Sequence, residues 1–308
     1  MKPIKTTLGN SIGLHRLLAV AFVALSVGSA RAQLYVAQYL NDTVAEFDQK
    51  SGATINGNFI SGLSAPTGIA ISGNKLYVAN WSASSIGVYN LSSGAAINPS
   101  LVSGVQPEGN IVVSGNSLYV ANYWGNNIAE YNATTGAPIN TSLISGVSQP
   151  IGLAISGNVL YVAYDTSTFG TIGEFNATTG AAINPSLVSL KYLNGIAVSG
   201  NNLYAMDDGH GVVNKYNATS GALVTASFVS GVGPRLGIAV SGNDLYVADY
   251  LANAIGEYDA TSGATINASL VSGLSGPEGI AIVTVPEPSA LGLLVVSVTA
   301  FFVRRRKQ

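Results

Sequence analysis

The sequence predicts an all-β chain, folded as a six-bladed β-propeller with four short strands in each blade. Three observations predict this fold class. The tetrapeptide Leu-Tyr-Val-Ala returns at a nearly fixed interval, four short strands can be read within each interval, and no segment keeps the periodicity of a helix. Because the fold is set by repetition, we look for function at the positions where the copies differ.

The tetrapeptide defines the length of the repeat. Its copies begin at Leu34, Leu76, Leu118, Leu160 and Leu245, and the variant Leu-Tyr-Ala-Met begins at Leu203. Successive copies are therefore 42, 42, 42, 43 and 42 residues apart. A unit of this length matches one blade of a propeller.

A single unit, residues 152–195, shows the expected strands. An apolar run at 152–155 is followed by a Ser-Gly-Asn turn and by the Leu-Tyr strand at 160–163, which predicts a tight hairpin. A polar loop leads to a third strand at 171–175, and the turn Asn-Ala-Thr-Thr-Gly leads to a fourth at 186–189. The same four strand types can be counted six times along the chain.

The phase of the repeat predicts how the ring closes. The chain enters the first blade at a second strand, at Leu34, and its last strand, 279–283, is of the innermost type. We therefore expect strand 279–283 to complete the first blade and to remove the exposed sheet edges. A β-solenoid is the alternative, but it needs shorter coils and terminal caps that the sequence does not show.

The amino terminus, residues 1–32, has the pattern of a secretory signal peptide. Basic residues precede an apolar run at 17–27, and Ala-Arg-Ala at 30–32 provides a small-residue cleavage site. A membrane anchor is the alternative, but the apolar run is short for a bilayer. The propeller is then expected to occupy residues 33–284.

The carboxyl terminus, residues 285–308, combines a Pro-Glu-Pro motif, an apolar stretch at 290–303 and a basic cluster. Its motif residues are Pro286, Glu287 and Pro288, and its basic residues include Arg304, Arg305 and Arg306. An apolar segment followed by a basic cluster stops transfer across a membrane. The tail resembles the PEP-CTERM sorting signal of Gram-negative bacteria. The resemblance implies an exosortase as processing partner, a transient stay in the inner membrane, and delivery to the cell surface or extracellular matrix. A simple C-terminal anchor is the alternative.

Composition narrows the classes of partner. Residues 33–284 contain five Lys and Arg against fourteen Asp and Glu, a formal charge of −9, which argues against nucleic acid and anionic membranes as partners. Acidity that serves solubility alone is the alternative. The chain has no cysteine, which excludes disulfides and thiol chemistry, and only His210 remains after removal of the signal. We interpret His210 as a solvent-exposed turn residue.

Several motifs resemble the NHL and YVTN families of propeller repeats. They are Leu-Tyr-Val-Ala-Asn-Tyr (118–123), Ile-Ala-Glu-Tyr (128–131), Ala-Thr-Thr-Gly (133–136) and Pro-Ile-Gly-Leu-Ala-Ile (150–155). The likeness covers residues 34–283. It implies the fold and leaves the function open, because members include surface proteins, binding modules and a few enzymes.

The residue before each inner-strand glycine is expected to face the axis. Around the ring these residues are Glu278, Thr67, Glu108, Ile151, Asn194 and Leu236. Glu108, Asn194 and Glu278 fall on alternate blades, and their oxygen atoms suit Ca²⁺. The pattern resembles the metal site of the gluconolactonase and regucalcin family. It departs from that family at the apolar Ile151 and Leu236, in lacking an Asp in the ring, and in having Arg235 close by.

Two further positions lie in the loops after the Leu-Tyr strands. The residue that follows the tetrapeptide is Gln38, Asn80, Asn122, Tyr164, Asp207 or Asp249, and we expect it chiefly to cap backbone N–H groups. The loops also carry aromatic rings that could stack on sugars or anchor protein partners. These aromatic residues are Trp81, Tyr123, Trp124, Tyr164, Phe169 and Tyr250. Packing between blades is the alternative role for the rings.

The leading functional hypothesis is an exported, non-catalytic binding or scaffold module for extracellular polysaccharide or a surface protein. It requires no cofactor. The alternative is an enzyme: a divalent-metal hydrolase of the gluconolactonase type holding Ca²⁺ on Glu108, Asn194 and Glu278, or a lyase of the virginiamycin B type. The lyase would need a partner for His210 that the sequence does not identify.

Overall fold

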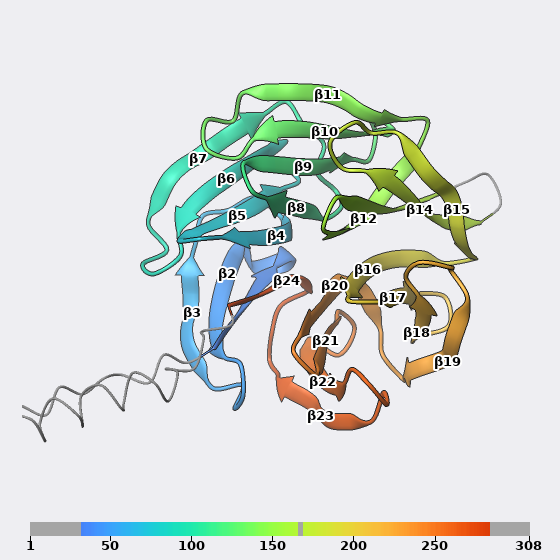
Figure 1. Cartoon of the computed structure of the whole chain (residues 1–308). Helices are drawn as coiled ribbons and strands as arrows, with labels where there is room; N and C mark the ends of the chain where they lie inside the picture. Colours follow the sequence, from blue (N-terminus) through green and yellow to red (C-terminus); the bar gives the residue numbers. More distant parts are fainter. Residues whose placement is uncertain (1–31, 166–168, 284–308) are drawn as a thin grey trace, which may run out of the picture. The chain divides into compact units, whose positions relative to one another are not determined.

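A computed structural model of the chain describes residues 32–165 and 169–283, and within this part six four-stranded antiparallel sheets are arranged as the blades of a ring (Figure 1). The predicted fold class is therefore confirmed. The predicted signal peptide (1–32, except Ala32) and the sorting tail (285–308), with Pro286, Glu287, Pro288, Arg304, Arg305 and Arg306, lie outside the described residues. Within the described residues, no helix has the length and apolar character needed to cross a membrane.

Each blade runs from an inner strand at the axis to an outer strand at the rim. The inner strands are β24 (Pro277–Val283), β4 (Pro66–Ser72), β8 (Ile111–Ser114), β12 (Ser148–Ser156), β16 (Leu193–Ser199) and β20 (Pro234–Ser241). The second strands are β1 (Gln33–Gln38), β5 (Lys75–Asn80), β9 (Ser117–Asn122), β13 (Val159–Asp165), β17 (Asn202–Asp207) and β21 (Asp244–Asp249). The third strands are β2 (Thr43–Asp48), β6 (Ser85–Asn90), β10 (Asn127–Asn132), β14 (Gly170–Asn176), β18 (Val212–Asn217) and β22 (Ala254–Asp259). The outer strands are β3 (Thr54–Ile60), β7 (Ala96–Ser103), β11 (Pro138–Ser145), β15 (Ala182–Leu190), β19 (Leu223–Ser230) and β23 (Thr265–Val271).

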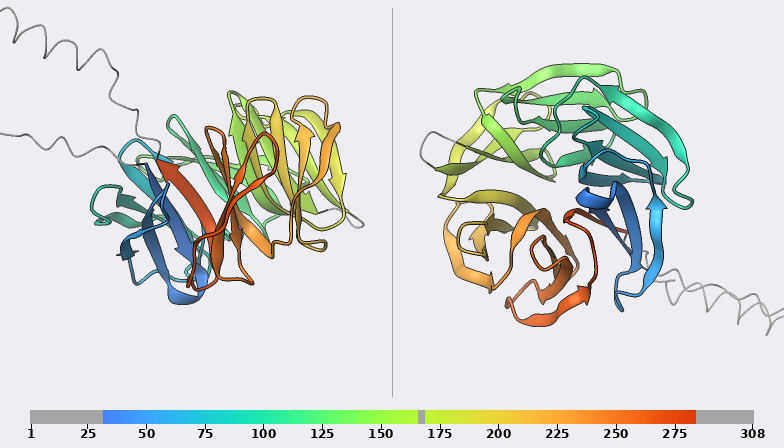
Figure 2. Two further views of the ribbon diagram at one scale, coloured as in Figure 1. Left: turned by 90° about the horizontal axis from the view of Figure 1, so that it is seen from below. Right: turned by 180° about the vertical axis from the view of Figure 1, so that it is seen from behind.

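The ring closes through the last strand, as the phase of the repeat predicts. Strand β24 pairs antiparallel with β1, with Leu34 opposite Ile282 and Val36 opposite Ile280. Figure 2 shows this strand (red) beside the first strands (blue). Because the first blade is completed by residues from the other end of the domain, the ring cannot open without breaking this pairing.

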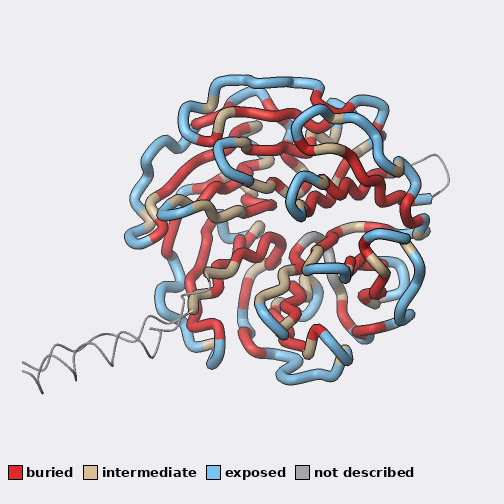
Figure 3. The backbone as a smooth tube through the Cα atoms, viewed as in Figure 1, coloured by how far each residue is buried: buried red, intermediate tan, exposed pale blue. Residues whose placement is uncertain are grey.

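Burial follows the layers of each blade (Figure 3). The Leu-Tyr-Val-Ala strands are almost fully buried, and Leu34, Leu76, Leu118 and Leu160 have no exposed surface. Six apolar clusters, each formed between adjacent blades, make up the core. The core therefore holds neighbouring blades together and leaves the outer strands at the surface.

The Leu-Tyr tyrosines tie each blade to the next. In five blades the buried hydroxyl donates to a backbone carbonyl in a turn of the following blade. These bonds are Tyr35 to Leu91 O (3.2 Å), Tyr77 to Ala133 O (2.8 Å), Tyr119 to Ala177 O (3.1 Å), Tyr161 to Ala218 O (3.3 Å) and Tyr204 to Ala260 O (2.6 Å). At the closure, Gln49 Nε2 donates to the Tyr246 hydroxyl at 2.9 Å. These tyrosines therefore pack and bond adjacent blades together.

The outer strands are exposed edges, and local side chains occupy part of their hydrogen-bonding capacity. In five blades an asparagine Oδ1 accepts from the backbone N–H two residues further on. The pairs are Asn56 with Asn58, Asn98 with Ser100, Asn140 with Ser142, Asn184 with Ser186, and Asn267 with Ser269. Irregular register between third and outer strands accompanies these bonds. Such bulged edges discourage pairing with other chains.

Candidate functional site

One face of the ring collects two kinds of loop, and we call it the loop face. Because consecutive strands are antiparallel, the loops joining second to third strands and those joining an outer strand to the next inner strand emerge on this face. Backbone hydrogen bonds join the two kinds of loop, for example Trp81 N to Ala65 O at 3.2 Å and Tyr123 N to Gln106 O at 3.1 Å. Among the described residues, the opposite face carries the Ser-Gly-Asn turns, the Asn-Ala-Thr-Thr-Gly turns and their variants, and the paired ends of β1 and β24.

The residue after each tetrapeptide caps loop backbone, as predicted, in five of six blades. The bonds are Ser275 N to Gln38 Oε1 (3.1 Å), Ser64 N to Asn80 Oδ1 (3.3 Å), Gln106 N to Asn122 Oδ1 (3.3 Å), His210 N to Asp207 Oδ1 (3.2 Å) and Ala252 N to Asp249 Oδ1 (2.8 Å). The first three stabilise the loop that enters the inner strand, and the last two stabilise the loop that follows the cap. These side chains therefore hold the loop face in shape.

A pocket of about 160 Å³ lies at the axis of the loop face. Its lining residues come from five blades: Tyr39, Thr67, Trp81, Glu108, Tyr123, Ile151, Asn194 and Glu278. Five of them are residues that precede an inner-strand glycine, as the repeat predicts. The sixth such position, Leu236, belongs to a segment whose side chains are not described.

Inner-strand glycines let the axial residues come this close together. A Cβ atom at Gly109 would lie 2.2 Å from the carbonyl oxygen of Ile151, and one at Gly237 would lie 2.0 Å from that of Glu278. Any side chain at these positions would push the neighbouring inner strand outward. The Glu-Gly and Asn-Gly pairs of the sequence therefore have a packing cause in addition to any role of their side chains.

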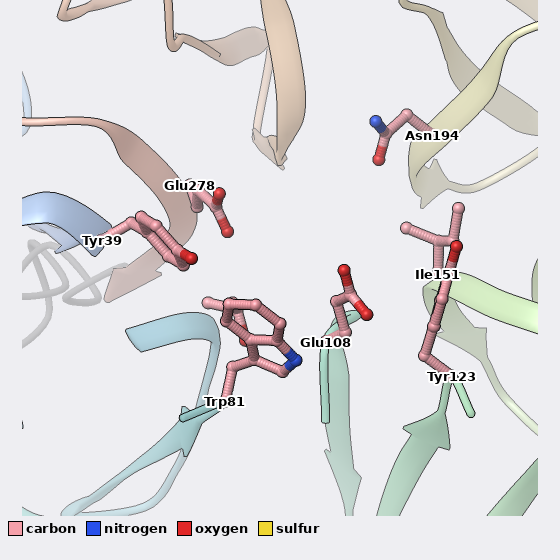
Figure 4. A pocket seen from close by; sticks show the side chains of 8 residues that line it. Tyr39, Trp81, Glu108, Tyr123, Ile151, Asn194 and Glu278 are labelled. Carbon is pink, nitrogen blue, oxygen red and sulfur yellow. The ribbon is translucent and has the colours of Figure 1, made fainter. Parts of the chain in front are cut away.

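Three oxygen-bearing side chains from alternate blades point toward a common space in the pocket (Figure 4). Glu278 is 2% exposed and Glu108 is half-buried, while Asn194 Oδ1 is buried without a hydrogen-bond partner among the described residues. Thr67 lies between two of them, and its hydroxyl donates to Pro107 O at 2.9 Å. The predicted convergence of Glu108, Asn194 and Glu278 is therefore observed.

The axial side chains supply few ligands for a metal ion. Among residues 32–165 and 169–283, no group of three or more His, Cys, Asp or Glu side chains is placed to hold a metal ion. The predicted set contains two carboxylates and one amide, whereas Ca²⁺ takes six to eight oxygen ligands. Binding of Ca²⁺ by Glu108, Asn194 and Glu278 stays a prediction.

Aromatic rings form part of the pocket wall. Tyr39 and Trp81 stack with their centroids 6.0 Å apart, and Tyr123 meets Trp124 edge to face at 5.0 Å. Burial raises the pKa of the Tyr123 hydroxyl, and the negative charges of Glu108 and Asp165 raise it further. Trp81 and Tyr123 line the pocket, whereas Trp124 is 59% exposed beside it.

The three remaining aromatic residues, Tyr164, Phe169 and Tyr250, do not line the pocket. Tyr164 is buried in the core, and its hydroxyl donates to Pro185 O at 2.6 Å, so the expectation of an exposed ring is wrong. Tyr164 lies within strand β13, opposite Thr171. The equivalent residues Gln38, Asn80 and Asp207 are also buried in their own blades. Tyr250 is partly buried, close to Gly276, and does not line the pocket.

Tyr39 is a pocket residue that sequence reasoning missed. It directly follows the cap residue Gln38, as Trp81 follows Asn80 and Tyr123 follows Asn122. The signal was therefore present in the repeat alignment, at the position one residue beyond the cap. The short 3₁₀ helix Tyr39–Asn41 places this ring over the pocket.

Large apolar side chains that are exposed fall into two sets. The outer rim carries one set, with members in every blade: Ile55, Ile97, Ile139, Ile183, Leu223, Val224 and Ile266. The other set, Leu40, Trp124, Phe169, Tyr192 and Leu251, lies in loops of the loop face. Within the described residues, no such side chain lies in a turn of the opposite face.

His210 also lies on the loop face but does not line the pocket. Its side chain is 64% exposed, and its Nδ1 lies 2.8 Å from the buried Asp207 Oδ2. The ring packs edge-on against Tyr192 with centroids 5.8 Å apart. This placement agrees with its interpretation as an exposed turn residue.

Comparison with known proteins shows the fold and leaves the family open. No protein-family model and no curated protein matches the chain. A solved propeller has the same fold. It belongs to a crystal structure of a nidogen/laminin complex, with a TM-score of 0.70 and 14% identity over 82% of this chain and 98% of that chain. A computationally designed protein, Ika8, gives a TM-score of 0.45 with 16% identity over 79% of this chain and 73% of that one. The resemblance to NHL and YVTN repeats stays a prediction.

Proposed function

We propose that this chain is an exported, non-catalytic binding module that holds an extracellular polysaccharide or a surface protein on its loop face. The observation that carries the proposal is that five separate loops of the loop face each expose a large apolar side chain, whereas no turn of the opposite face does so within the described residues. Large apolar side chains exposed on one face of a protein are typical of an interaction site. The propeller supplies a rigid scaffold for these loops, which suits recognition without chemistry.

The charge and the comparison agree with this proposal. The acidic body, at −9, would attract basic partners and repel anionic ones. The solved chain with the same fold comes from a complex named for two proteins, nidogen and laminin, so a propeller of this kind can take part in a protein complex. Export and surface sorting, by the predicted terminal signals, would place the module outside the cell.

The enzyme alternative remains as a second candidate because three oxygen-bearing side chains converge at the axis. A metal hydrolase would use Glu108, Asn194 and Glu278 as ligands, and its activity would require the metal. The binding proposal instead requires the exposed rings and does not depend on a metal. Chelation by EDTA therefore separates the two functions, since it would abolish hydrolysis and leave binding unchanged.

The test compares two apolar surfaces of the same protein. Labelled full-length chain is added to cells of the producing strain, and the retained fraction is measured. Trp124→Ala with Leu251→Ala, on the loop face, should lower retention about tenfold or more, because exposed anchors dominate such interfaces. Ile97→Ala with Ile139→Ala, on the rim, is the matched control and should leave retention unchanged. Equal loss in both variants, or in neither, would contradict the proposal.

A further inference from the structure

We infer that the axial pocket binds a primary ammonium group, the side chain of a lysine presented by a protein partner. This inference rests on the proposed function and assigns the axial pocket of the loop face to one class of ligand. Its basis is the match between the acceptors of the pocket and the donors of an ammonium group.

The three acceptor side chains of the pocket are arranged around the axis as the three N–H donors of an ammonium group are arranged around its C–N bond. Glu108, Asn194 and Glu278 stand on alternate blades of a six-bladed ring, so they approach the axis from three directions (Figure 4). A lysine –NH₃⁺ presents three N–H donors around the C–N bond and has no acceptor. A lysine that enters along the axis would direct one N–H toward each of these side chains.

The buried oxygen of Asn194 adds an independent argument. Asn194 Oδ1 has no hydrogen-bond partner among the described residues although it is buried, and an acceptor in that state costs free energy. A donor supplied by a ligand would satisfy it. The carboxylates need not be otherwise unoccupied, because each offers about four acceptor sites and can accept from a ligand as well as from a neighbour.

The pocket wall suits the remainder of a lysine side chain. Tyr39, Trp81 and Tyr123 line the pocket on the side where the loops open to solvent. Aromatic faces attract a cation and also pack against the aliphatic stem of lysine. The planar guanidinium of arginine fits less well, because its donors form a flat fork that favours bidentate contact with one carboxylate.

Other ligands of the same charge match the site less completely. Ca²⁺ takes six to eight oxygen ligands, and at one of the axial positions the ring offers it the apolar Ile151. An amino-sugar polymer would supply ammonium groups, but the loops of the loop face also expose the aliphatic Leu40 and Leu251. Aliphatic surface around a polar pocket is typical of protein interfaces.

The experiment uses Trp81 as the reporter. The chain has two tryptophans, so Trp124→Phe in the full chain leaves Trp81, in the pocket wall, as the only one. This variant is titrated with N-acetyl-lysine methylamide, with its Nζ-acetylated form and with the arginine analogue. We expect a saturable change in Trp81 emission with the lysine analogue and no change with its acetylated form. For the arginine analogue we expect a dissociation constant about fivefold larger than for the lysine analogue.

Charge-matched variants then test the site. Glu108→Gln with Glu278→Gln should weaken lysine binding about tenfold or more, because both charged acceptors are lost. Asp48→Asn with Asp259→Asn removes two charges from turns of the opposite face. Asparagine already occupies the equivalent positions Asn90 and Asn132, so this control keeps its turns and should bind lysine within about twofold of the parent.

The following results would each overturn the inference that the pocket binds a lysine side chain. Equal response to lysine and acetyl-lysine in the parent protein would do so even if the Glu variants failed to fold. Displacement of lysine by millimolar Ca²⁺ with metal-dependent hydrolysis would show a metal site, and tighter binding of glucosamine oligomers than of lysine peptides would show a glycan site. If cells retain the protein but lysine gives no signal, the inference fails and the proposed function stands. If cells do not retain the protein and lysine gives no signal, both the inference and the proposed function fail.

Discussion

The inter-blade tyrosine bonds allow a paired prediction of stability. Tyr77 is 2% exposed, and its hydroxyl donates to Ala133 O at 2.8 Å. Tyr204 makes the equivalent bond to Ala260 O at 2.6 Å, but Lys215 Nζ also donates to that oxygen at 3.0 Å. Replacement of either tyrosine by phenylalanine keeps the ring and removes only the donor. The two variants therefore differ in whether the buried carbonyl keeps a partner.

The expected magnitudes follow from that difference. Tyr77→Phe leaves Ala133 O without its hydroxyl donor in a buried turn, which should lower the free energy of unfolding by about 1–3 kcal/mol. Tyr204→Phe leaves Ala260 O bonded to Lys215, so the loss should be nearer about 0.5–1.5 kcal/mol. The cation over the Tyr204 ring, 5.5 Å from its centroid, also stays in place in the phenylalanine variant.

Urea unfolding of the full chain, followed by tryptophan fluorescence and far-UV circular dichroism, measures both values. A loss of about 2 kcal/mol lowers the midpoint by roughly 0.7 M at a slope of about 3 kcal/mol per molar. Coincident transitions from the two probes would justify the two-state treatment. A larger loss for Tyr204→Phe than for Tyr77→Phe would refute the reasoning, because it would show that the shared carbonyl does not decide the cost.

Two further predictions concern pH and inner-strand packing. Burial raises the pKa of twelve tyrosines, so above the unfolded-state pKa of about 10 the unfolded chain releases protons that the folded chain keeps, and stability is lost as pH rises. Each such tyrosine lowers the free energy of unfolding by about 1.4 kcal/mol for each pH unit between its unfolded-state and folded-state pKa. Circular dichroism should therefore show cooperative unfolding within about one to two pH units above pH 10. A protein that is still folded at about pH 12.5 would contradict this prediction. Gly237→Ala would place a Cβ 2.0 Å from Glu278 O and should destabilise the protein by about 1–3 kcal/mol or more, as judged by thermal melting. Gly57→Ala, whose Cβ would have no neighbour nearer than 3.8 Å, is the control, and an equal effect in both variants would argue against the packing explanation.

The sequence was sufficient for the architecture because a period constrains every copy at once. A repeat of 42 residues and the phase of its first and last strands predicted six blades and closure by strand 279–283, and both are observed. The same period predicted that the residues before inner-strand glycines would meet at the axis. Glu108, Asn194 and Glu278 do so because each occupies an equivalent position in its own blade.

Side-chain exposure near a loop was harder to predict, because it depends on how the loop packs over each position. Tyr164 occupies the position of Gln38, Asn80 and Asp207, which are buried in their own blades, and its ring lies in the core. Tyr39 shows the opposite error, since it was overlooked although its position was equivalent to those of Trp81 and Tyr123. The repeat identifies positions in the ring, and loop conformation decides which of them reach the pocket.

Hydrogen–deuterium exchange tests the central claim, that the loop face carries the function, most directly. The full chain would be measured free and after retention on cells of the producing strain. We predict that protection is confined to the loops at 39–42, 81–84, 123–126 and 250–253 and to the segments that enter the inner strands. Protection of the outer strands β3, β7 and β11, or of the turns on the opposite face, would contradict the account.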